Sequence, residues 1–230
     1  MADGKIPQEF EIGEPVVVCR WRLSSGTLPA ANRHLRALGW RTVLGEHPSK
    51  QLLSWAKQHI EWTLSEGSAL HPDGVLMLMI DEEGRAAMAV GAYEPLPGDD
   101  LSALVARARS AREEARLSAV APEVLWAMRD GQLVCALAAG ERCSGANSLV
   151  SDLARTLGMP VARDASLLDA LGRDPSDVDE AFLVSDEHGV VVASDASGDV
   201  GRRFRDGWER LLASANRPGG RAYRSRNPAN

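Results

Sequence analysis

Residues 179–194 read DEAFLVSDEHGVVVAS, and this stretch decides the fold of the chain. An apolar run from Ala181 to Val184, a polar turn that ends at Gly189 and a valine run over 190–192 predict an antiparallel hairpin. A hairpin with two apolar strands is expected at the centre of a sheet, because both of its faces need cover. The flanking chain must therefore supply further strands beside the hairpin and helices above it.

Outward from this hairpin, the chain mixes amphipathic helices with short strand pairs. Apolar residues at three- and four-residue spacing predict helices over residues 29–38, 48–66, 101–117, 146–157, 166–171 and 200–215. Strands are predicted over residues 14–23, 75–80, 85–93, 123–128 and 133–138. The arginines and glutamates of 101–117 are expected to form a solvated helix face. This mixture predicts an α/β (α+β) fold.

A break in regular structure at Tyr93-Glu-Pro-Leu-Pro-Gly98 predicts a domain boundary. The expected organisation is a flexible N-terminus over 1–13, a small α/β domain over 14–97, a larger α/β domain over 98–215 and a disordered basic tail over 216–230. The tail contains four arginines among proline, glycine and serine, without an apolar pattern.

Composition limits the partners and the compartment. The chain has 230 residues, 44% of them hydrophobic, and a formal net charge of -6, which argues against nucleic acid or an anionic membrane as a partner. It has neither an apolar run of about 18 residues nor a signal-like start, so we expect a cytoplasmic protein. Three cysteines and five histidines at spacings without a ligand pattern predict no metal site.

Four further segments carry, with this hairpin, a resemblance to a known family. They are the strand Val16–Arg22, the helix motif His34-Leu-Arg-Ala-Leu38, the segment Ala92–Pro97 and the loop and helix Ser144–Val161. In this order they resemble the fold-type IV (class IV) pyridoxal-phosphate enzymes, which include branched-chain and D-amino-acid aminotransferases and 4-amino-4-deoxychorismate lyase. The resemblance implies a two-domain class IV aminotransferase-like fold in a shortened form. It also implies a homodimer with its site at the domain junction.

The residues with which that family holds its cofactor are different here. The phosphate-binding arginine of the helix motif falls at Ala37, and the glutamate beside the pyridine nitrogen falls at Cys135 and Ala136. The Schiff-base lysine is expected near Leu101, but no lysine follows Lys57. Without a lysine, no Schiff base between protein and cofactor can form.

The phosphate-binding turn has also changed. Of its hydroxyl groups only Ser185 remains, and Asp186 and Glu187 would repel a doubly charged phosphate. Lys50 and Lys57 are expected to be solvated rather than to replace the missing amine. These differences predict that the protein uses no cofactor and that pyridoxal phosphate (PLP) does not bind.

Three residues are candidates for catalysis. Glu187 and His188 stand together in the hairpin turn and form a candidate general acid and base. Cys143 precedes a helix N-terminus, which is expected to lower the pKa of its thiol. The alternative interpretations are a solvated turn and an inert cysteine.

Five residues are candidates for substrate binding. Arg20 and Arg22 are two residues apart and therefore project from the same face of their strand. The resemblance implies that this face lines the cofactor cleft, where the two arginines could hold a carboxylate bidentately. Ser185 is the remaining hydroxyl of the turn. Asn147 and Ser148 lie at a helix N-terminus, whose free amides attract anions.

These observations favour a divergent class IV aminotransferase-like protein that has lost the PLP Schiff-base machinery. The hypothesis is a PLP-independent biosynthetic enzyme that acts on a small molecule bearing an amino or carboxylate group. One alternative is a non-catalytic pseudoenzyme that binds a protein partner. A second alternative is a genuine PLP-dependent aminotransferase or aminodeoxychorismate lyase with displaced motifs, so whether the chain is an enzyme stays open.

Overall fold

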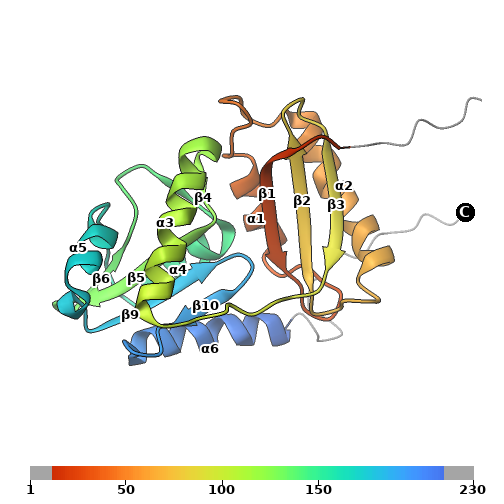
Figure 1. Ribbon diagram of the computed structural model, residues 1–230. Helices are drawn as coiled ribbons and strands as arrows, with labels where there is room; N and C mark the ends of the chain where they lie inside the picture. Colours follow the sequence, from red (N-terminus) through yellow and green to blue (C-terminus); the bar gives the residue numbers. More distant parts are fainter. Residues whose placement is uncertain (1–11, 215–230) are drawn as a thin grey trace, which may run out of the picture.

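The computed structural model describes residues 12–214, which form two β-sheets with helices packed against them (Figure 1). Most of the predicted N-terminal segment and the whole basic tail lie outside this range. Each sheet has its own cluster of buried hydrophobic side chains. The division into domains between residues 97 and 98 stays a prediction.

The N-terminal sheet has three antiparallel strands in the order β1 (Pro15–Arg22), β2 (Val75–Asp81) and β3 (Ala86–Gly91). Helices α1 (Ala31–Leu38) and α2 (Lys50–Gly67) contribute buried side chains to its core. Ser49 caps α2, because its hydroxyl accepts a hydrogen bond from the Leu52 amide at 3.0 Å. This cap places the start of α2 two residues after the predicted start. Figure 1 shows α2 behind the three strands.

The C-terminal sheet has five strands in the order β10-β9-β5-β6-β8, and only the pair β6 and β8 is parallel. The bounds are β5 (Glu123–Arg129), β6 (Gln132–Cys135), β8 (Val161–Arg163), β9 (Glu180–Ser185) and β10 (Gly189–Val192). A separate parallel pair joins β4 (Val120–Ala121) to β7 (Arg142–Cys143).

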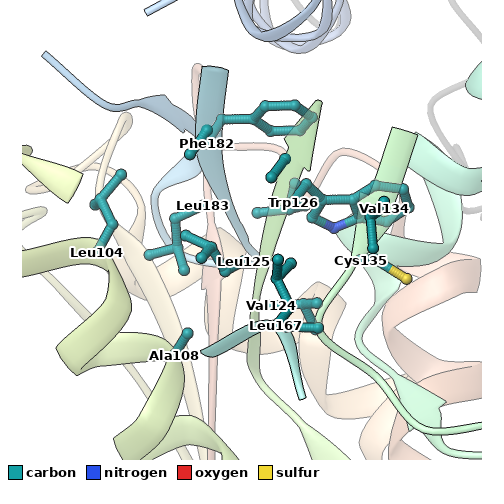
Figure 2. Close-up of a cluster of buried hydrophobic side chains, with 14 of the residues drawn as sticks. Leu104, Ala108, Val124, Leu125, Trp126, Val134, Cys135, Leu167, Phe182 and Leu183 are labelled. Atoms are coloured by element: carbon teal, nitrogen blue, oxygen red, sulfur yellow. The ribbon is translucent and has the colours of Figure 1, made fainter. Parts of the chain in front are cut away.

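Four α-helices pack against this sheet. They are α3 (Leu101–Ser118), α4 (Gly145–Thr156), α5 (Leu167–Arg173) and α6 (Asp199–Ser214), with a 3₁₀ turn at Pro175–Asp177. On one face, the ring of Phe182 lies 5.6 Å from that of Phe204 in α6. Figure 2 shows Leu104 of α3 beside Leu183, whose side chain points away from Phe182. The sheet is therefore covered from both sides, as its apolar strands require.

The hairpin of residues 179–194 forms as predicted but not at the predicted place. Val184 pairs with Val190 across the turn, and with Val124 of β5 on the other side. Strand β10 pairs only with β9, so the hairpin lies at one edge of the sheet, and the expectation of a central position was wrong. Helix α6 packs against β10, and its Phe204 ring lies against Phe182 of β9, so the helix covers one face of the hairpin while the outer edge of β10 has no strand beside it among residues 12–214.

None of the helices within residues 12–214 combines the length and the apolar character needed to cross a bilayer.

Candidate functional site

A cleft of about 330 Å³ lies between the two halves of the chain. Strand β1 and helix α1 form one wall, while α3, the start of β5 and the turn after β9 form the other. Its lining includes the ionisable residues Arg20, His34, Arg41, Arg107, Glu114, Glu123, Asp186 and Glu187. The cleft therefore presents cations and carboxylates to the same space.

The three cleft arginines differ in how tightly they are held. Arg107 makes a bidentate pair with Glu123, with nitrogen–oxygen distances of 2.9 and 2.8 Å, and this bonding raises the pKa of Arg107. Arg41 is buried and donates to Glu114 at 3.1 Å. Arg20 is half exposed, and its Nε lies 3.9 Å from the carboxylate of Glu187. Arg20 is thus the cleft guanidinium with the most freedom to bind an external anion.

Glu187 lines the cleft and His188 lies beside it outside the lining, so their role as an acid–base pair stays a prediction. The Nε2 atom of His188 is 3.8 Å from Glu187 and 3.9 Å from Glu123, and Nδ1 is 3.5 Å from the hydroxyl of Tyr93. Burial lowers the pKa of His188 to about 4. Burial also raises the pKa of Glu187, against the opposing charge of Arg20. At neutral pH the pair therefore combines a neutral imidazole with a carboxylate that accepts a proton more readily than usual.

Arg22 lies on the same strand face as Arg20 but has a different role. Its guanidinium carbon is 3.4 Å from the centroid of the Tyr93 ring, a cation–π contact. Burial lowers the pKa of Arg22, and the nearby Tyr93 opposes this effect. Arg22 is not part of the cleft lining, so the structure separates the two arginines that the sequence placed together.

Ser185 lines the cleft, but its hydroxyl is engaged in the turn. Its Oγ accepts hydrogen bonds from the backbone amides of Glu187 at 3.1 Å and His188 at 3.2 Å. Ser185 therefore fixes the backbone that carries the acid–base pair.

Asn147 and Ser148 lie outside the cleft lining. The side chain of Asn147 is fully buried, accepts a bond from the Trp126 indole at 2.8 Å and donates to the Val184 carbonyl at 3.0 Å. The Ser148 hydroxyl donates to the Gly145 carbonyl at 2.7 Å. Both side chains are satisfied within the protein, so their predicted role in substrate binding is replaced by one in holding α4.

Cys143 is buried in β7 and does not line the cleft. Burial raises the pKa of its thiol, and the charge of Arg163 only partly opposes this. The expectation that the adjacent helix terminus lowers this pKa was therefore wrong. A thiol in this state is a poor nucleophile.

The sequence patterns do not single out Arg107 or Glu123: the charges of 101–117 predict a solvated face, and Glu123 is only the first residue of a predicted strand. A signal was present. Arg107 stands three residues after Leu104 and four before Ala111, and both of these apolar residues are buried. An arginine beside the buried stripe of a helix points along its edge, where a neighbouring strand can meet it.

No group of three or more His, Cys, Asp or Glu side chains is placed to hold a metal ion within residues 12–214.

The sequence matches no family model and no curated protein, but its structure resembles many solved ones. A PLP-bound hypothetical aminotransferase from Mycobacterium tuberculosis matches with a TM-score of 0.59 and 13% identity, over 91% of this chain and 96% of that one. A fold IV-transaminase from Curtobacterium pusillum matches at 0.55 and 17%, over 93% and 91%. The 4-amino-4-deoxychorismate lyase from Pseudomonas aeruginosa matches at 0.51 and 16%, over 84% and 90%. The chain therefore has the class IV aminotransferase fold.

These matches contradict the expectation that no cofactor is used. Besides the PLP-bound form, the M. tuberculosis aminotransferase is described in a form with α-ketoglutarate and PMP, and an aminotransferase from Brucella abortus is described as bound to the cofactor PLP. The similar structures thus point to PLP rather than to the absence of a cofactor.

The cleft residues do not fit a covalently attached PLP. No lysine lines the cleft in the described part of the chain, and Lys50 and Lys57 are exposed on α2. The N-terminal amides of α4, which suit a phosphate, are bonded to the carboxylate of Asp186. Residues 12–214 therefore place no lysine amine for a Schiff base in this cleft.

Proposed function

We propose that this protein is a class IV aminotransferase-like enzyme whose cleft binds a small amino acid or a related carboxylate. The observation that carries the proposal is the mixed charge of the cleft, in which the loosely paired Arg20 lies near Glu187 and Glu123. A guanidinium binds a carboxylate, and carboxylates bind an ammonium group, so the two charges of an amino acid both find partners. A volume of about 330 Å³ suits a molecule of this size.

Glu187 is the proposed proton-accepting group, with His188 as its buried neighbour. Glu187 lines the cleft, and its raised pKa suits a carboxylate that takes a proton from a bound ammonium or carbon acid. His188 is neutral at pH 7 and lies beside Glu187 without a hydrogen bond to it, at 3.8 Å. His188 therefore acts in this proposal as a buried, neutral neighbour of Glu187, and Glu187 holds the transferred proton.

The printed descriptions of the similar structures make PLP the first ligand to test. In this chain Arg20 is the cleft group best placed to meet an anionic ligand. A homodimer is the assembly that the family resemblance suggests, and light scattering of the purified protein tests it.

The experiment is a thermal-shift panel with amino acids, their 2-oxo acids and PLP. Wild-type protein is expected to be stabilised by at least one amino or oxo acid, because a ligand that binds only the native state raises its stability. Arg20→Gln is expected to lose this response. Arg203→Gln, on the exposed surface of α6, is the matched control and should keep it.

Loss of the response in both variants, or no response in the wild type, contradicts the proposal. Co-purification of another protein with a wild type that responds to no ligand would instead favour the partner-binding alternative.

A further inference from the structure

Asp186 makes an unusual set of contacts at the bottom of the cleft. Its carboxylate accepts a hydrogen bond from the Ala146 amide at 2.6 Å and from the Gly145 amide at 3.3 Å. These are the first amides of α4, a helix of 12 residues. Asp186 comes from the hairpin turn, 40 residues away in sequence from Ala146, and is 7% exposed.

A second buried group points at the same carboxylate. His34 of α1 is 1% exposed, and its Nδ1 lies 3.2 Å from an oxygen of Asp186. Neither ring nitrogen of His34 has a well-aligned hydrogen-bond partner among residues 12–214. An unmatched polar group inside a protein is costly. The carboxylate of Asp186 lies close to Nδ1, so the buried imidazole is directed at this anion.

The contacts of Asp186 also join the two halves of the chain. Its backbone carbonyl accepts from the Arg22 amide at the end of β1 at 2.9 Å, while its side chain meets α1 and α4. Nearby, Arg33 of α1 donates to Asp152 of α4 at 2.9 Å. Asp186 and His34 both line the cleft, so the same contacts that bind the halves together set its width.

Burial alone would raise the pKa of Asp186, but the charge of His34 and the Ala146 amide outweigh it and hold this pKa below its usual range. Asp186 is therefore an anion throughout the neutral range.

We infer that Asp186 is a built-in anion that occupies the anion-binding position at the N-terminus of α4. Through its contacts with His34 and β1, Asp186 also holds the two sides of the cleft together. A carboxylate or phosphate from solution is excluded from this position while Asp186 holds it. The anionic group of a cleft ligand is then expected to bind Arg20 instead. The occupancy of the position by Asp186 does not depend on the proposed function.

The test removes the carboxylate from the N-terminus of α4 and then supplies a carboxylate from solution. Asp186→Ala removes the carboxylate, and we expect the melting temperature to fall by about 5–10 °C, since a buried charged acceptor is lost. Sodium formate, which replaces the missing carboxylate, is expected to restore at least half of this loss in a saturable way. Sodium chloride at the same ionic strength should not. Wild-type protein should show no difference between the two salts.

Asp100→Ala is the matched control, because Asp100 also accepts from a helix amide, that of Ala103 at 3.0 Å, but lies exposed at the start of α3. Formate should not rescue it. Equal responses of Asp186→Ala and wild type to formate would overturn the inference. If Asp186→Ala folds in neither salt, Asp186→Asn decides: a lowered melting temperature supports the built-in anion, and an unchanged one refutes it.

Discussion

Replacing His188 by glutamine is predicted to remove a specific pH dependence of stability. The pKa of His188 is about 4 in the folded protein, against an ordinary value of 6.5. As the pH falls from 6.5 towards 4, His188 becomes protonated in the unfolded chain but stays neutral in the folded one. The free energy of unfolding therefore decreases over this range, and the contribution of His188 becomes nearly independent of pH about one unit above 6.5.

The magnitude follows from the two pKa values. Their separation corresponds to about 3 kcal/mol in full. The interval from pH 7.5 to pH 5 ends above the folded-state pKa, and water in the adjacent cleft screens the effect, so we expect about 1–2 kcal/mol over this interval.

The assay is urea unfolding at these two pH values, followed by tryptophan fluorescence. The stability of the wild type relative to His188→Gln should decrease by this amount on acidification. Because other titrating groups are common to both proteins, they cancel to a first approximation. A difference that stays constant within about 0.3 kcal/mol would refute the burial argument.

Two further predictions concern the packing around the hairpin. Gly189→Ala should cost about 2–4 kcal/mol, because the residue has a φ of 71° and an added Cβ would lie 2.1 Å from Nε1 of Trp208. Gly131→Ala, with a φ of 72° and no atom within 4 Å of the added Cβ, should cost only about 1 kcal/mol in the same urea titration, and equal losses would contradict the packing argument. Asn147→Ala should cost about 2–4 kcal/mol and change the fluorescence of Trp126, because the indole N–H loses the Asn147 oxygen to which it donates; a loss below about 0.5 kcal/mol would contradict the buried network.

The local part of the fold could be predicted from the sequence. The turn residues and the apolar runs gave the hairpin of residues 179–194 its strands, since these signals act over a few residues. Its position at the sheet edge could not be predicted in the same way. It depends on the pairing of β9 with β5, a strand much earlier in the chain.

The sequence likewise predicts some residues of the candidate site and not others. Arg20, Glu187 and His188 were identified, because a strand face and a polar turn are visible in the sequence. Arg107 and Glu123 were not, because their pairing at 2.8 Å joins a helix to a strand 16 residues later. The place of Arg107 beside the buried stripe of its helix is visible in the sequence, but its partner on the strand is not.

Asp186 shows the limit most clearly. From the sequence it was a charge that would repel a phosphate. In the structure its carboxylate instead bonds the amides of α4, 40 residues away at Ala146. The same residue thus changes from a surface turn charge to a buried anion once the tertiary contacts are known.

The most direct test of the account is the affinity of the cleft for an amino acid or oxo acid, measured by isothermal titration calorimetry with the ligand that gives the largest thermal shift. Arg20→Gln should bind it about 10- to 100-fold more weakly than the wild type, since a charged hydrogen-bonding partner of the carboxylate is lost. Arg203→Gln should bind it as the wild type does. Equal affinities of wild type and Arg20→Gln would show that the mixed-charge cleft does not hold the ligand's carboxylate, and would contradict the proposed function.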